Sequence, residues 1–341
     1  MGGKPRQGVT TMRIIVSGAA GFIGFHLCRR LLAAGHQVVG VDNLITGSTV
    51  NAADLRAIPG FTFIQEDICR PLAIEGPIDR IYDLACPASP IDFHSKAVEI
   101  MLTCSIGVKN LLDLAKDRSA LMLHASTSEC YGDPLEHPQK ETYRGNVNPI
   151  GPRAPYDEGK RFAEAMVMTY QRLHGVATRM VRIFNTYGPR MRADDGRALP
   201  SFINQALRGD PITIHGDGSQ TRSFCYVDDM VEAILRAADS DCVEPINVGN
   251  DVEITIRQAA ETVIELTGSR SPIICTERPV NDPERRRPDL SRARQMLGWS
   301  PTTDWRRGFA KTIEYFKSVR RSQPRVSPMG DRPASLTENV P

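Results

Sequence analysis

The chain has 341 residues, of which 41% are hydrophobic and 24% charged, values that exclude a disordered chain and a collagen-like repeat. Its 42 Lys and Arg against 40 Asp and Glu leave a formal net charge of +2, which gives no reason to expect nucleic acid or a membrane surface as a partner. The eight cysteines contain no Cys-x-x-Cys pair, and the seven histidines show no metal-ligand spacing. We therefore expect a cytoplasmic protein with reduced thiols and no metal.

Short apolar runs alternate with helical patterns along the first half of the chain. Runs of the kind that buried parallel strands need occur at 13–17, 38–42, 61–64, 81–84, 121–124 and 181–184. Between them, apolar residues recur at helical spacing, first from Ile23 to Leu31 and later near 97–116 and 157–174. Strict alternation of strand and helix predicts an α/β fold, a Rossmann-type doubly wound parallel sheet covered on both faces.

The pattern changes after Asn185. Helical stretches near 199–208, 227–238, 256–267 and 305–319 are separated by turns rich in Gly and Pro and by short strands. This arrangement predicts a smaller α+β substrate-binding lobe. The domain boundaries that we expect are a flexible N-terminus at 1–11, a Rossmann-type domain at 12–185, the lobe at 186–321, partly interleaved with that domain, and a disordered tail at 322–341.

A glycine-rich turn, Gly-Ala-Ala-Gly-Phe-Ile-Gly at 18–24, joins the first expected strand to the first helix. Gly18 and Gly21 permit a tight turn and a close approach of the backbone to a pyrophosphate, and Gly24 permits close packing of helix on strand. The alternative is an ordinary strand–helix turn, which has the same glycine pattern and binds no cofactor. Asp42, eighteen residues after Gly24 at the end of the second strand, distinguishes the two: an acid there binds the adenosine ribose and favours NAD over NADP. Further candidate cofactor contacts are Phe22, Ile23, Asn43 and Asp67; a solvated loop acid explains the last equally well.

Tyr156 and Lys160 form a second motif, because residues four apart share one face of a helix. A nearby cation favours the phenolate and moves a tyrosine toward use as a general base. This spacing is common, and a solvent-facing pair is the alternative. Thr127, Ser128 and Glu129 follow an apolar strand, at the edge where open α/β sheets bind ligands. Thr127, Tyr156 and Lys160 together resemble the catalytic triad of the extended short-chain dehydrogenase/reductase family.

The sequence around the triad resembles NAD-dependent UDP-glucuronate decarboxylases, also called UDP-xylose synthases. The similarity runs from about 12 to 316, and its most specific segments are 127–134, 145–153, 156–161, 182–191, 220–224, 286–289 and 297–299. The resemblance implies a homodimer with bound NAD that acts on UDP-glucuronate. Oxidation at C4, loss of CO2 from the 4-keto acid and re-reduction by the NADH formed would then give UDP-xylose.

The resemblance also implies roles for individual residues. Tyr156, aided by Lys160 and Thr127, would take the C4 hydroxyl proton, whereas Ser128 and Glu129 form a pairing typical of the decarboxylases. Glu129 and Arg222 would position the carboxylate and help to reprotonate C5; a capping or surface role for Glu129 and a structural ion pair for Arg222 are the alternatives. Candidate substrate contacts are Ser89, Asn185, Arg190, Arg222 and Arg286, the last from a basic run that could also be a solvated loop.

One segment departs from the family. Phe93 stands where these decarboxylases usually have a tyrosine, and Cys104 stands where they have an asparagine. Release of UDP-4-keto-pentose, or another epimerase or dehydratase reaction on a nucleotide sugar, therefore stays open. Outside the enzymes, the alternative is an NAD-sensing protein without catalysis, against which the intact triad argues. We interpret Cys86 and the other thiols as packing residues.

Overall fold

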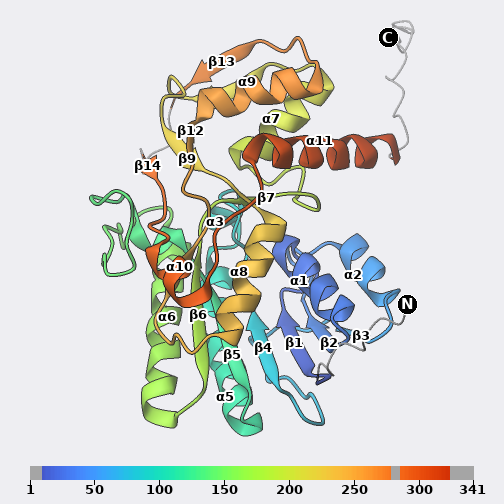
Figure 1. Ribbon diagram of the computed structural model, residues 1–341, viewed down its shortest axis with the longest axis vertical. Coiled ribbons are helices and arrows are strands. Elements are labelled where there is room, and N and C mark those ends of the chain that lie inside the picture. The colour runs from blue at the N-terminus through green and yellow to red at the C-terminus, as the bar shows by residue number, and fades with distance from the viewer. Residues whose placement is uncertain (1–9, 278–284, 323–341) are drawn as a thin grey trace, which may run out of the picture.

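The computed structural model describes residues 10–277 and 285–322. Its centre is a seven-stranded sheet in the order β11-β6-β5-β4-β1-β2-β3, in which every neighbouring pair is parallel (Figure 1). The strands are β1 (Arg13–Ser17), β2 (Gln37–Val41), β3 (Phe61–Ile64), β4 (Arg80–Asp83), β5 (Leu121–Thr127), β6 (Thr178–Ile183) and β11 (Ile246–Val248). The predicted doubly wound α/β fold is confirmed.

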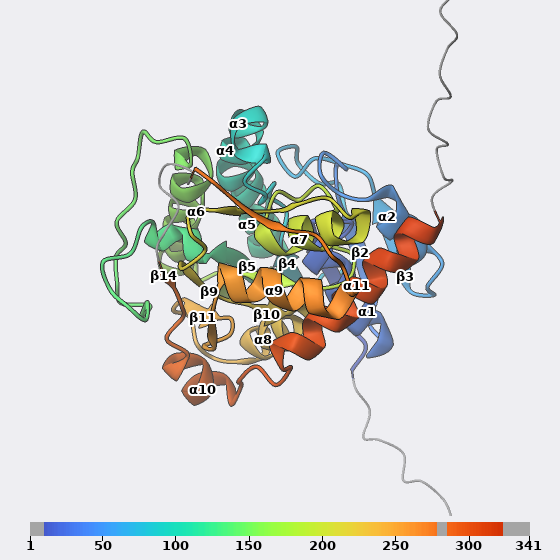
Figure 2. The same ribbon diagram turned by 90° about the horizontal axis from the view of Figure 1, so that it is seen from above.

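Helices cover both faces of this sheet. Figure 2 shows α1 (Phe22–Ala33) and α8 (Val227–Asp239) on one side, with α5 (Val108–Arg118) and α6 (Ala154–His174) on the other. Successive residues of a strand point to opposite faces, so Ile14 belongs to the core beneath α1 and α8, whereas Ile15 belongs to the core beneath α5 and α6. Both faces are buried, which is why the strands are continuously apolar.

The smaller lobe lies over one end of the sheet in both views, with its three longer helices above the strands (Figures 1 and 2). Those helices are α7 (Ala198–Arg208), α9 (Ile256–Thr267) and α11 (Trp305–Ser322). Three small sheets complete it: β8 (Ile212–His215) with β13 (Ile273–Thr276), β7 (Thr186–Tyr187) with β10 (Cys225–Tyr226), and β9 (Thr221–Ser223) between β12 (Glu253–Thr255) and β14 (Arg285–Arg286). The core around α1 and α8 continues into this lobe, where Phe309 packs edge-on against Tyr187.

The chain crosses between the two parts more than once. β11 lies far beyond residue 185 and pairs with β6 in the large sheet, and α10 (Ser291–Leu297) packs against β11. The domain division at 185 therefore remains a proposal. The expected N-terminal and C-terminal flexible segments, 1–11 and 322–341, lie largely outside the described residues, although α11 includes Ser322.

The remaining short elements surround the carboxyl ends of the strands. They are α2 (Thr49–Arg56), α3 (Asp92–Ser95), α4 (Ala97–Leu102), a π-helical turn η1 (Thr103–Gly107) and a 3-10 turn η2 (Ser128–Tyr131). The π-turn η1 joins α4 to α5 without a break. Such a turn widens a helix locally, and in proteins it is frequently found at functional sites.

Candidate active site

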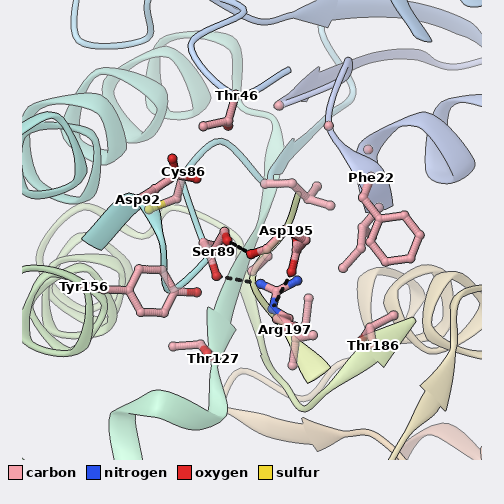
Figure 3. A pocket seen from close by; sticks show the side chains of 18 of the residues that line it. Phe22, Thr46, Cys86, Ser89, Asp92, Thr127, Tyr156, Thr186, Asp195 and Arg197 are labelled. Carbon is pink, nitrogen blue, oxygen red and sulfur yellow. Dashed lines mark hydrogen bonds and ion pairs between the residues drawn. The ribbon is translucent and has the colours of Figure 1, made fainter. Parts of the chain in front are cut away.

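Two adjoining cavities open where β1, β2, β4 and β5 end, the edge at which open α/β sheets bind ligands. The larger cavity reaches under the lobe and is shown in Figure 3. The smaller one extends toward β2 and β3. The residues that line both are Gly18, Gly21, Thr46, Leu84 and Cys86. The two cavities together therefore form a continuous path over the glycine-rich turn.

At Gly18 and Gly24 the glycine-rich turn has no room for a side chain. A Cβ on Gly18, which has φ of 70°, would lie 2.8 Å from the carbonyl carbon of Leu84, and a Cβ on Gly24 would lie 2.1 Å from the Gly18 carbonyl oxygen. Gly21 is the N-cap of α1 and offers no side chain to cap the first amides of the helix, and residues 21–24 of that first turn line the larger cavity. This backbone fits the pyrophosphate of a dinucleotide.

Asp42 follows β2 and lines the smaller cavity. Its carboxylate accepts hydrogen bonds from the Ala20 amide at 3.0 Å and from the Leu44 amide at 2.8 Å. Burial raises the pKa of Asp42, and these two amides partly oppose the rise. Asn43 donates to Asp67 at 3.1 Å on the same cavity wall. An adenosine ribose fits here, with its hydroxyls facing carboxylates, and the predicted cofactor contacts Phe22 and Ile23 line the larger cavity.

The predicted triad comes together at the inner end of the larger cavity, where Figure 3 labels Tyr156 and Thr127. Lys160, buried on α6, donates to the carbonyl oxygen of Ala125 at 2.9 Å. The pKa of Tyr156 is raised overall, because burial outweighs the Lys160 ammonium and a hydrogen bond with Thr127, both of which lower it. Phe93 stacks on the Tyr156 ring, with centroids 4.7 Å apart. The tyrosine is thus fixed in one orientation beside a buried cation.

Glu129 is held between two arginines. Its carboxylate forms ion pairs with Arg153, at the N-cap of α6, and with Arg286, on β14. Burial alone would raise the pKa of Glu129, but the two guanidiniums outweigh burial and lower it to about 2. Burial and the nearby Glu129 charge raise the pKa of Asp157 to about 7. Glu129 is consequently a buried, ionised residue rather than a solvated surface acid.

The predicted substrate contacts lie at different distances from this centre. Ser89 and Asn185 line the larger cavity, and Ser89 donates to the Asp195 carbonyl oxygen (Figure 3). Arg190 also lines it, but its guanidinium is directed to Asp54 at 2.6 Å, on α2. Arg222 is buried on β9 beside β14 and donates to the carbonyl oxygen of Thr221 at 2.8 Å.

Among the described residues, neither Arg222 nor Arg286 lines the two cavities, so only Arg286 reaches the site, through Glu129. Arg153 was not predicted, although it lies one helical turn before Tyr156 within a segment that carries the family resemblance. Arg192 and Arg197, which also line the larger cavity, had no sequence signal. Both pair with acids of the same wall, Arg192 with Asp92 at 3.0 Å and Arg197 with Asp195 at 3.5 Å.

Within residues 10–277 and 285–322, no group of three or more His, Cys, Asp or Glu residues is placed to hold a metal ion. Over the same residues, no helix is long and apolar enough to cross a membrane.

A Rossmann sheet with this glycine turn and a buried Tyr-x-x-x-Lys pair defines a nucleotide-cofactor enzyme of the extended short-chain dehydrogenase/reductase class. The sequence pattern of the NAD dependent epimerase/dehydratase family matches residues 14–249, and the chain belongs to that family. It is 49% identical over 315 residues to UDP-glucuronic acid decarboxylase 3 of Arabidopsis thaliana, covering 92% of this chain and 91% of that protein. It is 47% identical over 304 residues to UDP-glucuronic acid decarboxylase 1 of Danio rerio, covering 89% of this chain and 72% of the relative.

Solved structures of the same family are similar in fold. A UDP-glucose 4-epimerase from Thermotoga maritima with UDP-glucose has a TM-score of 0.84 at 27% identity, covering 91% of this chain and all of that one. A UDP-glucuronic acid 4-epimerase from Bacillus cereus, in complex with UDP-glucuronic acid and NAD, has a TM-score of 0.81 at 29% identity, with 90% of this chain covered. The family resemblance inferred from the motifs is thus confirmed.

Proposed function

We propose that this protein is an NAD-dependent decarboxylase that converts UDP-glucuronate to UDP-xylose. The decarboxylases to which it is nearly half identical support this function, and the structure adds the buried Glu129 and its two arginines beside the triad. This arginine–carboxylate group is the observation that carries the proposal, because acid–base groups for C4 alone would suit an epimerase equally well.

The two cavities divide the ligands between them. The smaller cavity, with Asp42, Asn43 and Asp67, takes the adenosine of NAD, and the glycine turn takes its pyrophosphate. Bound NAD supplies a reversible hydride acceptor for C4 of the sugar. The sugar nucleotide occupies the larger cavity, where Ser89 and Asn185 offer polar side chains. Arg192 and Arg197, which Asp92 and Asp195 hold in place, offer N–H donors to its diphosphate.

Tyr156 removes the proton from the C4 hydroxyl of the sugar. Lys160 stabilises the phenolate through its charge, and the hydroxyl of Thr127 is placed to hydrogen-bond both the phenolate and the sugar oxygen. Because the Ala125 carbonyl holds the ammonium, Lys160 acts from a fixed position. General acid–base assistance of this kind contributes about 10²–10⁴-fold to the rate.

The C4 ketone lies β to the C6 carboxylate, so CO2 leaves with its bonding electrons passing into an enolate whose oxygen is at C4. The hydroxyls of Tyr156 and Thr127 donate to that oxyanion, where preorganised donors contribute most. Arg153, which lines the larger cavity, offers positive charge for the substrate carboxylate. Glu129 holds that guanidinium in place, and the buried Arg286 in turn holds Glu129. Ser128, which lines the larger cavity, is the candidate for assisting protonation at C5, whereas Arg222 lies outside both cavities.

The test is to supply the purified protein with UDP-glucuronate and to measure CO2 together with the nucleotide-sugar product. We expect CO2 and UDP-xylose in equal amounts, with little or no dependence on added NAD. A 4-epimerised UDP-sugar acid without CO2 would contradict the proposal. Binding of NAD without turnover of any sugar nucleotide would favour the sensor instead.

We also propose a homodimer formed by α4 and α6, which contact each other. Large apolar side chains are exposed on this pair and its continuation: Val98 (64%), Met101 (53%), Leu102 (41%), Ile106 (45%) and Phe162 (53%). A second copy of the same face would bury them. Sedimentation should give a dimer that Phe162→Asp dissociates; a monomeric parent protein would refute this. A cytoplasmic location is likewise proposed, supported by the eight free cysteines.

A further inference from the structure

Two cysteines far apart in the sequence meet at the wall of the cofactor path. The Sγ atoms of Cys86 and Cys104 are 3.7 Å apart. Cys86 lies on the loop after β4, and Cys104 lies in the π-turn η1 between α4 and α5. Both are free thiols, and neither has a role in the mechanism proposed above.

The pair connects the cavity wall to the catalytic helix. Cys86 is partly buried and lines both cavities, and Figure 3 labels it on the same wall as Tyr156. Cys104 is 1% exposed and packs on α6 at Gly159, where a Cβ would lie 3.3 Å from the Cys104 Cβ and 3.4 Å from its Sγ. Gly159 immediately precedes Lys160. A movement of either sulfur is therefore transmitted to the cofactor path or to the helix that carries the triad.

The surroundings favour a thiolate within the pair. The contact with Cys86 lowers the pKa of the Cys104 thiol; burial opposes this, and the Lys160 ammonium lowers the pKa further. A thiolate is the form that attacks oxidised sulfur. A disulfide needs an S–S distance of about 2.05 Å, so the two sulfurs must approach by a little over 1.5 Å in total.

We propose that Cys86 and Cys104 are a modification site, a dithiol that a peroxide oxidises to a disulfide and that thereby switches off the enzyme. The contact with Cys104 and burial raise the pKa of the Cys86 thiol, so Cys86 first passes its proton to the Cys104 thiolate across the 3.7 Å contact. The Cys86 sulfur, which lines both cavities, then attacks the O–O bond of hydrogen peroxide and becomes a sulfenic acid as one water leaves. The Cys104 sulfur attacks that sulfenic sulfur, the S–S bond forms, and the sulfenic oxygen leaves with the Cys104 proton as a second water. Two thiols lose two electrons and two protons, and one peroxide gives two waters.

The disulfide affects binding and catalysis together. Drawing Cys104 away from Gly159 removes packing beneath Tyr156 and Lys160, and drawing Cys86 inward reshapes the wall that both cavities share. NAD in the path covers Cys86, so bound NAD protects the dithiol. Thermodynamic linkage then requires that the disulfide weaken NAD binding by the same factor by which NAD disfavours oxidation. A small dithiol restores the thiols by exchange.

The experiment oxidises the purified full-length protein with hydrogen peroxide, with and without saturating NAD. Mass spectrometry of the peptides detects the Cys86–Cys104 cross-link, and calorimetry measures NAD binding before oxidation, after oxidation and after dithiothreitol. We expect the cross-linked peptide, at least tenfold weaker NAD binding, recovery with dithiothreitol and slower cross-linking when NAD is present. Oxidation that leaves these two peptides unlinked would overturn the proposal, as would a cross-link that leaves NAD binding unchanged.

Matched variants separate this pair from other thiols. Cys104→Ser is expected to keep NAD binding within about threefold and to lose the sensitivity to peroxide, whereas Cys275→Ser, at an exposed thiol of the lobe, stays sensitive. A Cys104→Ser protein inactivated as fast as its parent would refute the disulfide. If that variant does not fold, the peptide map of the parent protein still shows whether peroxide links Cys86 to Cys104. The inference uses the proposed function only for an activity readout: an inactive reduced protein would refute the function, and a missing cross-link would refute the switch.

Discussion

Arg286 forms an ion pair with Glu129 across 157 residues of chain, and this contact connects the lobe to the end of β5. Arg286 also donates to the carbonyl oxygen of Gly132 at 3.2 Å, so its guanidinium spans the whole of the 3-10 turn η2. The side chain is buried, whereas that of its neighbour Arg285 is 58% exposed. A substrate carboxylate that enters beside Thr127 meets a preformed positive group.

We predict that Arg286→Gln lowers kcat by at least 10²-fold while NAD binding is retained, because Glu129 loses a charged partner and no longer holds Arg153 in position for the substrate carboxylate. The matched control is Arg285→Gln, one residue away and exposed, which should stay within about threefold of the parent. Steady-state kinetics with UDP-glucuronate decide the matter. Equal losses in both variants would show that the basic run acts only through its net charge.

Tyr156→Phe removes one hydroxyl and little volume, so the stacking on Phe93 is kept. We expect unchanged NAD binding, with turnover reduced by about 10²–10⁴-fold, as general acid–base catalysis requires. The measurements are calorimetry for the cofactor and product formation for turnover. A rate above one-tenth of the parent's would remove Tyr156 from the proton transfer.

Asp42 should make the protein select NAD over NADP, because a carboxylate beside the ribose repels a 2′-phosphate. Asp42→Asn keeps an acceptor for the Ala20 and Leu44 amides and removes the charge. The ratio of the dissociation constant for NADP to that for NAD should therefore fall by at least tenfold. Direct titration with both dinucleotides measures it. NADP binding tighter than NAD to the parent protein would show that Asp42 faces away from the ribose.

The raised pKa of Asp157, about 7, predicts a pH-dependent stability. The folded pKa of this carboxyl lies above its unfolded value of 3.8, so ionisation of Asp157 lowers the free energy of unfolding. This destabilisation is absent below pH 4, grows as the pH rises from 4 to 7, and stays constant above pH 7. Asp157→Asn should therefore gain about 2–3 kcal/mol more in free energy of unfolding at pH 8 than at pH 5. Urea unfolding at pH 5 and pH 8 measures the free energy of unfolding of the variant and the parent. An equal difference between them at the two pH values would contradict the prediction.

At Glu129 the pH dependence of stability has the opposite sign. Its pKa is lowered to about 2, so the stability that its ion pairs give is complete above pH 4.5 and is lost only as the pH falls toward 2. Glu129→Gln also removes the charge that raises the pKa of Asp157, so urea unfolding should show this variant to be less destabilised at pH 8, where Asp157 is ionised, than at pH 5. A larger loss of stability at pH 8 than at pH 5 would contradict the coupling of the two carboxyls.

Local sequence patterns predicted the parts of the site that local structure builds. The glycine turn, Asp42 and the Tyr156–Lys160 face each depend on neighbouring residues in one strand–turn–helix unit, and the periodicity of the strands gave the fold class. The contact of Arg286 with Glu129 depends on how β14 packs beside η2, which no short pattern contains.

Long-range packing also explains the other residues at which the structure differs from the sequence-based expectation. Arg190 is part of a segment that carries the family resemblance, yet its guanidinium pairs with Asp54 because α2 lies beside it in the fold. The sequence predicts packing roles for Cys86 and Cys104, because no neighbouring histidine pattern marks either as a nucleophile. In the fold the turn η1 brings their sulfurs to 3.7 Å. Long-range pairing therefore determines the residues that local patterns missed.

The most direct test of the account uses UDP-glucuronate labelled with 13C at C6 and deuterium at C4, with mass spectrometry of the gas and of the nucleotide sugar. Oxidation and reduction at the same carbon by one bound NAD predict labelled CO2 together with UDP-xylose that keeps its deuterium, without added cofactor. A nucleotide-sugar product that retains the 13C label, with no labelled CO2, would contradict the assignment of this site to decarboxylation.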